Sequence, residues 1–165
     1  MLFRSGSPDT VWAKSRALLR VGDFVPVKLS GGVSEVPVTM AVTCRVGAQF
    51  QILALVDTGA AYTVLSDDLA ATLREENVLG SSLESLTLST RHGSVKCNLH
   101  QLELVIVADG GRDLHIDATC AVPEPEQWEG PTVIGFYTVL ESLRFAVEVQ
   151  QSPGEPSWLY FDAAG

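Results

Sequence analysis

From Asp23 onward, the apolar residues recur at every second position or stand in short uninterrupted runs, and turns that mostly contain glycine separate these runs. A spacing of two sends successive side chains to opposite faces of an extended strand, whereas a helix needs a spacing of three to four. This pattern restricts the chain to a mostly β fold. The predicted strands cover approximately residues 24–29, 36–44, 50–56, 83–88, 95–99, 102–107, 114–122, 133–134 and 144–149.

Two or three short helices are expected beside these strands. Residues 7–22 begin with a capping serine, a proline and an aspartate and end at a glycine, which predicts an amphipathic helix. Residues 66–76 begin with a serine and two aspartates, and their inner face carries leucine and alanine, which predicts a second helix. A third and shorter helix is expected between Gly135 and Leu143.

The length of 165 residues suits one domain with short extensions. We expect an N-terminal extension over residues 1–22, the main domain over 23–150 and a C-terminal tail over 151–165. The tail carries the apolar cluster Trp158–Phe161, which favours docking over a free end. The cluster can be an edge strand at a dimer interface or can pack on its own subunit, and the sequence does not separate these two.

Charge and hydropathy exclude several classes of function. With 46% hydrophobic residues the chain is an ordered globular protein, and its net charge of −9 argues against nucleic acid or an anionic membrane as the main partner. The longest uninterrupted apolar stretches have about five residues, far fewer than the roughly 20 that cross a bilayer, so no membrane span is expected.

The three cysteines, Cys44, Cys97 and Cys120, are an odd number without a short paired spacing. They are interpreted as reduced, mostly buried thiols, which together with the absence of a secretory signal pattern favours the cytoplasm. Neither the cysteines nor the histidines show the clustering of a metal site.

One acidic residue stands in an unusual place. The apolar run Ile52–Val56 predicts a buried strand, and Asp57 follows it directly in the triplet Asp57-Thr58-Gly59. A charge at the end of a buried strand is costly unless hydrogen bonds or function compensate for it. Thr58 can hold the loop through its hydroxyl, and Gly59 allows backbone amides to approach the carboxylate of Asp57.

This segment closely resembles the active-site loop of the retropepsin-like aspartic proteases, which has an apolar strand, then Asp57-Thr58-Gly59-Ala60, then a segment such as Thr63–Ser66. The apolar pair plus glycine of that family is matched by Val133-Ile134-Gly135. Between the two elements the family has a flap hairpin with glycine near its tip, and Thr90-Arg91-His92-Gly93 lies there. The resemblance covers roughly residues 23–150 and implies a single-lobe acid-protease β-barrel.

The resemblance also implies an activity and a partner. Aspartic proteases hold one water between two carboxylates, and this chain has one such triplet, so the second carboxylate is expected from Asp57 of another copy in a symmetric homodimer. The substrate is expected to be a peptide in extended conformation beneath the flap. Thr58, Gly59 and Ala60 would support the active-site loop, Ile134 and Gly135 would support it from below, and no metal or organic cofactor is required.

The sequence departs from the family pattern at three points. Tyr137 stands where the family often has Asp or Asn, two residues after the glycine of the second element. The flap has one glycine where viral members have several. The stretch 109–131 is long and acidic compared with small viral members.

Other interpretations of these residues remain. Asp57 can belong to a β-turn or cap whose carboxylate only satisfies backbone amides, and His92 can be an ordinary exposed turn residue. A phosphate-binding loop is disfavoured because no Gly-Lys-Ser/Thr follows Gly59. The principal alternative function is a dimerisation or peptide-binding module of the same fold with little or no proteolytic turnover.

Overall fold

The computed structural model describes residues 13–22, 27–28, 34–35, 39–47, 49–90, 93–150 and 152–165. Its helices are α1 (Asp67–Glu75) and a single 3-10 turn, η2 (Leu140–Ser142). Its strands are β1 (Ser15–Gly22), β2 (Val27–Lys28), β3 (Ser34–Glu35), β4 (Thr39–Val46), β5 (Phe50–Val56), β6 (Thr63–Val64), β7 (Glu84–Thr90), β8 (Gly93–Ile106), β9 (Leu114–Pro123), β10 (Val133–Ile134), β11 (Leu143–Glu148) and β12 (Ser157–Ala163).

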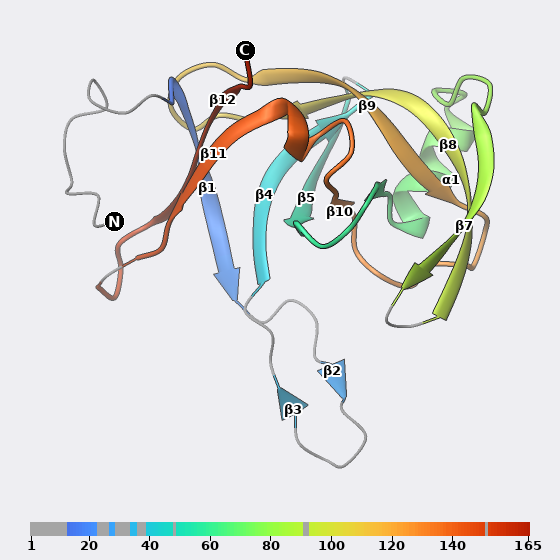
Figure 1. Ribbon diagram of the computed structural model, residues 1–165, viewed down its shortest axis with the longest axis horizontal. Helices are drawn as coiled ribbons and strands as arrows, with labels where there is room; N and C mark the ends of the chain where they lie inside the picture. Colours follow the sequence, from blue (N-terminus) through green and yellow to red (C-terminus); the bar gives the residue numbers. More distant parts are fainter. Residues whose placement is uncertain are drawn as a thin grey trace.

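Ten of these strands form one sheet in the order β11-β12-β1-β4-β5-β10-β6-β9-β8-β7. A further antiparallel pairing joins β4 to β8, with Cys44 opposite Ile106, and this closes six strands into a barrel (Figure 1). Strands β1, β12 and β11 continue the sheet beyond β4, and β7 continues it beyond β8. The mostly β, single-lobe barrel predicted from the sequence is confirmed.

The core lies inside the barrel and is continuous with the underside of α1. Its largest fully buried side chains include Leu104 and Ile106 of β8, Leu73 of α1 and Phe161 of β12. Because α1 buries Leu69, Ala70 and Leu73 while its charged residues are exposed or half-buried, the amphipathic pattern predicted for residues 66–76 is confirmed.

The remaining strand predictions agree in part with the structure. The strand predicted at 50–56 coincides with β5, and 114–122 matches β9. The segments predicted separately at 95–99 and 102–107 are one continuous strand, β8. The polar residue between them, His100, is buried within this strand, and its ring nitrogen Nδ1 lies 3.0 Å from the Gly80 carbonyl oxygen.

Part of the strand prediction falls beyond what can be compared. Of the segment predicted at 24–29, the structure describes only β2, which pairs with β3. Residues 24–26 and 29 lie outside the described residues, and so do residues 36–38 of the strand predicted at 36–44. After Gly135 the predicted short helix is present only as the single turn η2.

The helix predicted for residues 7–22 is wrong over its second half. Residues 1–12 lie outside the described residues, but 15–22 form β1, which pairs with β4 and β12. From Ala13 to Arg20, buried and exposed residues alternate strictly, with the cationic side chains on the exposed face. The sequence contains this period of two, but the helix-favouring leucines and the glycine at the end of the segment suggested a helix. In the folded chain, pairing on both edges of the strand outweighs the local propensity for helix.

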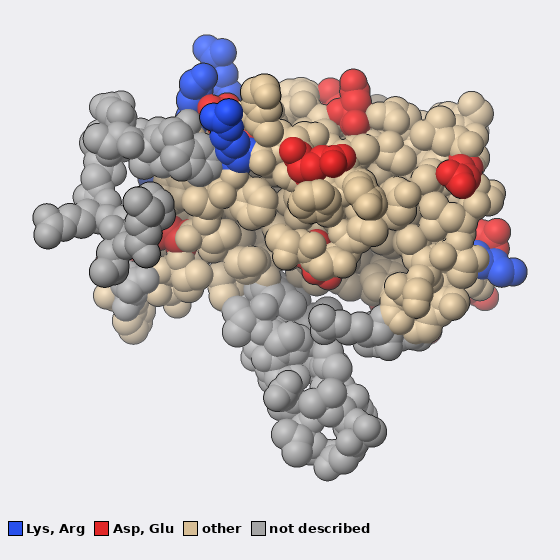
Figure 2. Space-filling model, viewed as in Figure 1, with Lys and Arg blue, Asp and Glu red and all other residues tan. Residues whose placement is uncertain are grey.

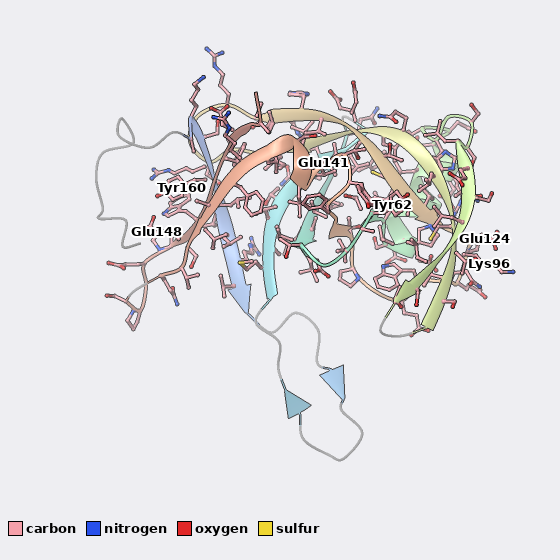
Figure 3. All side chains as sticks on the ribbon, viewed as in Figure 1. Tyr62, Lys96, Glu124, Glu141, Glu148 and Tyr160 are labelled. Atoms are coloured by element: carbon pink, nitrogen blue, oxygen red, sulfur yellow. The ribbon has the colours of Figure 1, made fainter. Side chains whose placement is uncertain are left out.

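The C-terminal cluster 158–161 lies in β12, between β1 and β11 of the same chain. On its outer face the guanidinium carbon of Arg16 lies 4.3 Å from the centre of the Trp158 ring, a cation–π contact. The hydroxyl of Tyr160 donates a 2.7 Å hydrogen bond to Glu148 on β11, and Figure 3 shows these two side chains together on neighbouring strands. The tail therefore forms part of the sheet.

We expect Phe161→Ala to lower the free energy of unfolding by about 3–5 kcal/mol, because it empties a fully buried aromatic position in the strand that links β1 to β11. The neighbouring change Asp162→Ala, on the partly exposed side of the same strand, is the control and should cost less than about 1 kcal/mol. Urea denaturation of the three proteins measures both values; equal stability of wild type and Phe161→Ala would show that β12 does not contribute to the core.

Candidate active site

Asp57 follows the last residue of β5, at the point where two neighbouring strands hold the backbone. Strand β5 pairs antiparallel with β4 and parallel with β10, so that Val56 lies opposite Ile134. The Asp57 N–H continues this ladder by donating a 3.1 Å hydrogen bond to the Ile134 carbonyl oxygen. The backbone of Asp57 is therefore fixed by the sheet, although its side chain lies beyond the end of the strand.

The turn after Asp57 is organised by the aspartate itself. Its carboxylate oxygen Oδ1 accepts a 2.8 Å hydrogen bond from the Gly59 N–H, and its carbonyl oxygen accepts one of 3.2 Å from the Ala60 N–H. A Cβ on Gly59 would stand 3.2 Å from Oδ1, so a side chain there would crowd the carboxylate. The amide contact expected from the sequence is present, and it fixes one carboxylate oxygen while the residue remains exposed to solvent.

Thr58 and Gly59 are exposed beside Asp57, and Ala60 is partly buried. All three lie in one turn at the end of β5. The structure therefore brings together the four loop residues predicted from the sequence and presents the carboxylate outward.

The second predicted element packs directly against this loop. Ile134 is buried, and the N–H of Gly135 donates a 3.1 Å hydrogen bond to the hydroxyl of Thr63, which is itself fully buried. A Cβ on Gly135 would overlap the carbonyl group of Tyr62 and lie 2.8 Å from the Thr63 nitrogen. Only glycine allows the two segments to approach this closely.

Thr63 was not among the site residues predicted from the sequence. A threonine between Tyr62 and Val64 fits the ordinary composition of a strand, and its partner Gly135 lies 72 positions away. The sequence does contain one signal for this role: Thr63 is a polar residue within an apolar segment, and a buried hydroxyl needs a hydrogen-bond partner.

Two further backbone hydrogen bonds continue the contact between the segments. The N–H of Phe136 donates to the Ala60 carbonyl oxygen and the N–H of Tyr137 donates to that of Ala61, each at 2.8 Å. The loop that carries Asp57 is thus joined by backbone hydrogen bonds to the segment after β10, and a movement of one segment has to displace the other.

The turn that follows is held in a strained conformation. Thr138 has a φ of 65°, which is uncommon for a β-branched residue. Three hydrogen bonds hold it: its N–H donates to Glu141 Oε1 at 2.5 Å, its hydroxyl accepts from the Thr119 N–H at 2.8 Å, and its carbonyl oxygen accepts from the Ser142 hydroxyl at 2.7 Å. Strained residues persist where the surroundings determine their conformation, so this turn is rigid.

Three aromatic side chains gather on the outside of the joined segments. The ring centres of Tyr62 and Tyr137 are 5.5 Å apart, and those of Phe136 and Tyr137 are 6.1 Å apart. Tyr137 was noted in the sequence as a departure from the family pattern, but its grouping with Tyr62 could not be predicted because the two are far apart in the chain.

The flap hairpin is formed by β7 and β8. Thr90 lies opposite Gly93 at its end, and the Thr90 hydroxyl donates a 2.8 Å hydrogen bond to the Gly93 carbonyl oxygen. Gly93 has a φ of +120°, a conformation that favours glycine. Arg91 and His92, the other two predicted flap residues, lie outside the described residues.

A second apolar cluster connects the hairpin to the active-site loop. Its buried members are Val64, Val95, Cys97, Leu99 and Ala121, and the partly buried members packed against them are Tyr62, Leu86, Leu88 and Trp128. Because this cluster contains residues of both hairpin strands together with Tyr62 and Val64, the hairpin shares one apolar cluster with the segment that follows Asp57.

The cysteines contribute packing but no reactive thiol to this arrangement. Burial raises the pKa of Cys44 and of Cys120 to about 12, and burial together with the Glu124 carboxylate raises the pKa of Cys97 to about 11. All three are free, buried and protonated at neutral pH, which makes them poor nucleophiles.

No group of three His, Cys, Asp or Glu side chains suited to a metal occurs among the described residues. His115 is hydrogen-bonded to Glu103 at 2.8 Å.

Within the same described ranges, no helix is long and apolar enough to cross a membrane.

No protein-family model and no curated protein matches this chain. Among solved structures, a retropepsin-like aspartic protease from Rickettsia conorii is similar to it, with a TM-score of 0.44 and 17% sequence identity. The alignment covers 88% of this chain and 96% of that chain.

We expect Gly135→Ala to destabilise the protein by at least about 2 kcal/mol, because the added methyl group meets rigid backbone at Tyr62 and Thr63. Gly80→Ala is the matched control: a Cβ there meets no atom within 4 Å, so its effect should stay within about 0.5 kcal/mol. Thermal and urea unfolding measure both, and a Gly135→Ala protein as stable as Gly80→Ala would contradict the close approach described for these segments.

Proposed function

We propose that this chain is an aspartic endopeptidase that acts as a homodimer, with one Asp57 from each copy. The observation that carries the proposal is the placement of Asp57: an exposed carboxylate, oriented by the Gly59 N–H, on a turn that the sheet and the Gly135–Thr63 contact hold in place. A merely structural aspartate would not need a turn so firmly supported from two sides.

The chemistry requires a second carboxylate in contact with the same water. The sequence contains the strand-Asp-Thr-Gly arrangement once, at residues 57–59. A twofold axis beside this turn would bring two identical turns face to face, because an isologous contact pairs the same surface of both subunits. The exposure of Asp57 to solvent is compatible with such an approach.

In this proposal the two Asp57 carboxyl groups share one proton, as in the general scheme for aspartic proteases. The ionised group accepts a proton from water, and the water oxygen bonds to the carbonyl carbon of the peptide. The protonated group donates its proton to the carbonyl oxygen. The carboxyl group that took the proton from water then donates it to the amine nitrogen as the C–N bond breaks. One hydroxyl of the tetrahedral intermediate returns its proton to the other carboxylate, so that the carboxylic acid product forms and the pair regains its starting state.

The remaining loop residues take supporting roles. Thr58, exposed beside Asp57, would brace the partner's loop across the axis, and Gly59 and Ala60 would let the substrate backbone approach. Hairpin β7–β8, with its tip at residues 90–93, would close over an extended peptide and exclude water. The apolar cluster that the hairpin shares with Tyr62 and Val64 supports this role, because it couples the hairpin to the segment after Asp57.

We expect Asp57→Asn to abolish peptide cleavage, by a factor of at least about 1,000, while the protein keeps its fold and its dimer, because the amide cannot accept the proton from water. Asp117→Asn, the same substitution on the exposed side of β9, is the control and should retain full activity. Digestion of a peptide library by the three purified proteins at several pH values measures this. Equal cleavage by wild type and Asp57→Asn would refute the catalytic assignment, and dimers that bind but never cleave peptides would favour the non-enzymatic module.

Specific activity should fall on dilution, by about tenfold for each tenfold dilution once the concentration lies well below the dissociation constant of the dimer. An excess of Asp57→Asn protein added to a fixed amount of wild type should inhibit it, because mixed dimers contain only one carboxyl group. Enzyme assays paired with sedimentation velocity test both effects; a monomer with full specific activity would overturn the shared site.

A further inference from the structure

Cationic side chains gather on one face of the sheet, although the chain as a whole is acidic. Strand β1 exposes Lys14, Arg16, Leu18 and Arg20 at alternate positions and buries the residues between them. Successive side chains of a strand point to opposite faces, so these four share the outer face of the sheet. Three of the 11 Lys and Arg residues of the chain therefore stand in a single row.

The two neighbouring strands extend this row into a surface. On β12, Trp158 lies opposite Leu18 and Tyr160 lies opposite Arg16. On β11, Arg144 lies opposite the next outward-facing residue of β12. Residues paired across strands point to the same face. This surface is here called the basic face, and its cations and aromatic side chains are Lys14, Arg16, Arg20, Arg144, Trp158 and Tyr160.

The carboxylates of the basic face leave much of its positive charge uncompensated. Asp162 Oδ2 lies 3.9 Å from Lys14 Nζ, at the limit of an ion pair, and the Lys14 side chain is 85% exposed. Glu148 accepts a hydrogen bond from a tyrosine of β12. Among the described residues, neither Arg20 nor Arg144 forms an ion pair. The face therefore has four cations against two carboxylates, in a chain whose net charge is −9.

The distribution of charge over the surface is uneven. In Figure 2, most of the visible Lys and Arg side chains gather at the upper left, over the start of β1 and the end of β12 in Figure 1. Asp and Glu side chains are spread over the rest of that view. Figure 3 shows Lys96 of β8 at the opposite end of the molecule from Tyr160. An anionic ligand is therefore attracted to the basic face and repelled by most of the remaining surface.

Arg16 is oriented before any ligand binds. Its N–H donates a 2.8 Å hydrogen bond to the Gly110 carbonyl oxygen, and its carbonyl oxygen accepts one of 2.9 Å from the Asp109 N–H. Its guanidinium carbon lies 4.3 Å from the centre of the Trp158 ring. The ring orients the guanidinium group without neutralising its charge, which lowers the entropy lost when a carboxylate binds there.

A groove of about 280 Å³ opens at one end of the basic face. Leu18 and Arg20 line it from β1, and Glu155 and Pro156 line it from the segment before β12. Leu18 is 39% exposed, so the groove offers an accessible apolar side chain between two cationic positions of the row. A ligand that matches this surface needs both acidic and apolar groups.

The spacing of the row fits an extended polypeptide. Side chains two residues apart on one strand are separated by about 6.5–7 Å. An extended segment laid along β1 presents the side chains of one face at the same interval. Its carboxylates can therefore meet Arg16 and Arg20 while the side chain between them meets Leu18.

Charge also favours a short acidic segment over a long polyanion. A nucleic acid carries phosphates along its whole length, and beyond the basic face these phosphates would meet a predominantly acidic surface. A polypeptide can confine its carboxylates to the few residues that contact the cations.

We infer that the basic face is a docking surface for an extended acidic segment of another protein, whose carboxylates meet the cations of β1 and whose apolar side chain enters the groove beside Leu18. This inference goes beyond the proposed function and does not depend on it, because the docking surface is formed by β1, β11 and β12 and needs no cleavage.

The probe is a fluorescently labelled peptide of about eight residues with glutamate at alternate positions and one leucine in place of a central glutamate. Its binding to the full chain is followed by fluorescence anisotropy, in the Asp57→Asn background so that the probe stays intact. Arg16→Glu and Arg20→Glu should each raise the Kd at least about fivefold, since each replaces attraction with repulsion. Raising the salt from about 50 to about 200 mM should weaken binding as well.

Lys96→Glu is the matched control, because it changes the net charge equally on an exposed residue at the other end of the molecule. Its Kd should stay within about twofold of the unmodified background. Leu18→Ser should weaken the leucine peptide by about threefold and leave a peptide with serine at that position unchanged. Circular dichroism identifies variants that fail to fold, and Arg20→Glu carries the test if Arg16→Glu does not fold.

Several results would overturn the inference. These are a peptide that does not bind, folded Arg16→Glu and Arg20→Glu proteins that bind as tightly as the background, and a Lys96→Glu protein that is weakened as much as they are. A single-stranded DNA oligonucleotide that binds more tightly than the peptide and responds to the same variants would assign the basic face to nucleic acid instead. Self-association that the same variants abolish in sedimentation velocity would assign it to a second copy. Loss of peptide cleavage by the wild-type chain would refute only the proposed function.

Discussion

The hydrogen bond from the Gly135 N–H to the buried hydroxyl of Thr63 is the contact on which the candidate site depends. It joins the segment after β5 to the segment after β10 at a separation that no side chain larger than hydrogen permits. A buried N–H without this partner would be costly, so both residues are required together. The loop that carries Asp57 and the segment that carries Phe136, Tyr137 and Thr138 meet at this one junction.

How much of the fold the sequence predicts depends on whether the deciding interaction is local. Strand β5 and helix α1 were predicted close to their observed bounds, because an apolar run and an amphipathic pattern with a capping sequence are complete within a few residues. Strand β1 was mistaken for helix because its alternation is short and rich in helix-favouring residues. Only its pairing with β4 and β12, distant in sequence, makes it a strand.

The same distinction holds for the site. The turn from Asp57 to Ala60 could be predicted because the carboxylate and the amides that approach it lie within three residues. The grouping of Tyr62 with Tyr137 and the partner of the Thr63 hydroxyl could not be predicted, because both depend on residues about 70 positions apart. Of the predicted flap tip, the structure describes Thr90 and Gly93, whose pairing sets the end of the hairpin.

Strand β12 has a consequence for the order of folding. It lies between β1 and β11, so that Ser15 pairs with Phe161 across almost the entire described chain. The barrel strands β4 to β10 can pair through much shorter loops, whereas β1 needs a partner strand that lies far later in the sequence. Long-range closure of this kind slows folding, and until it occurs one edge of β1 is open to other chains. The docking of β12 therefore determines when this edge of β1 becomes protected.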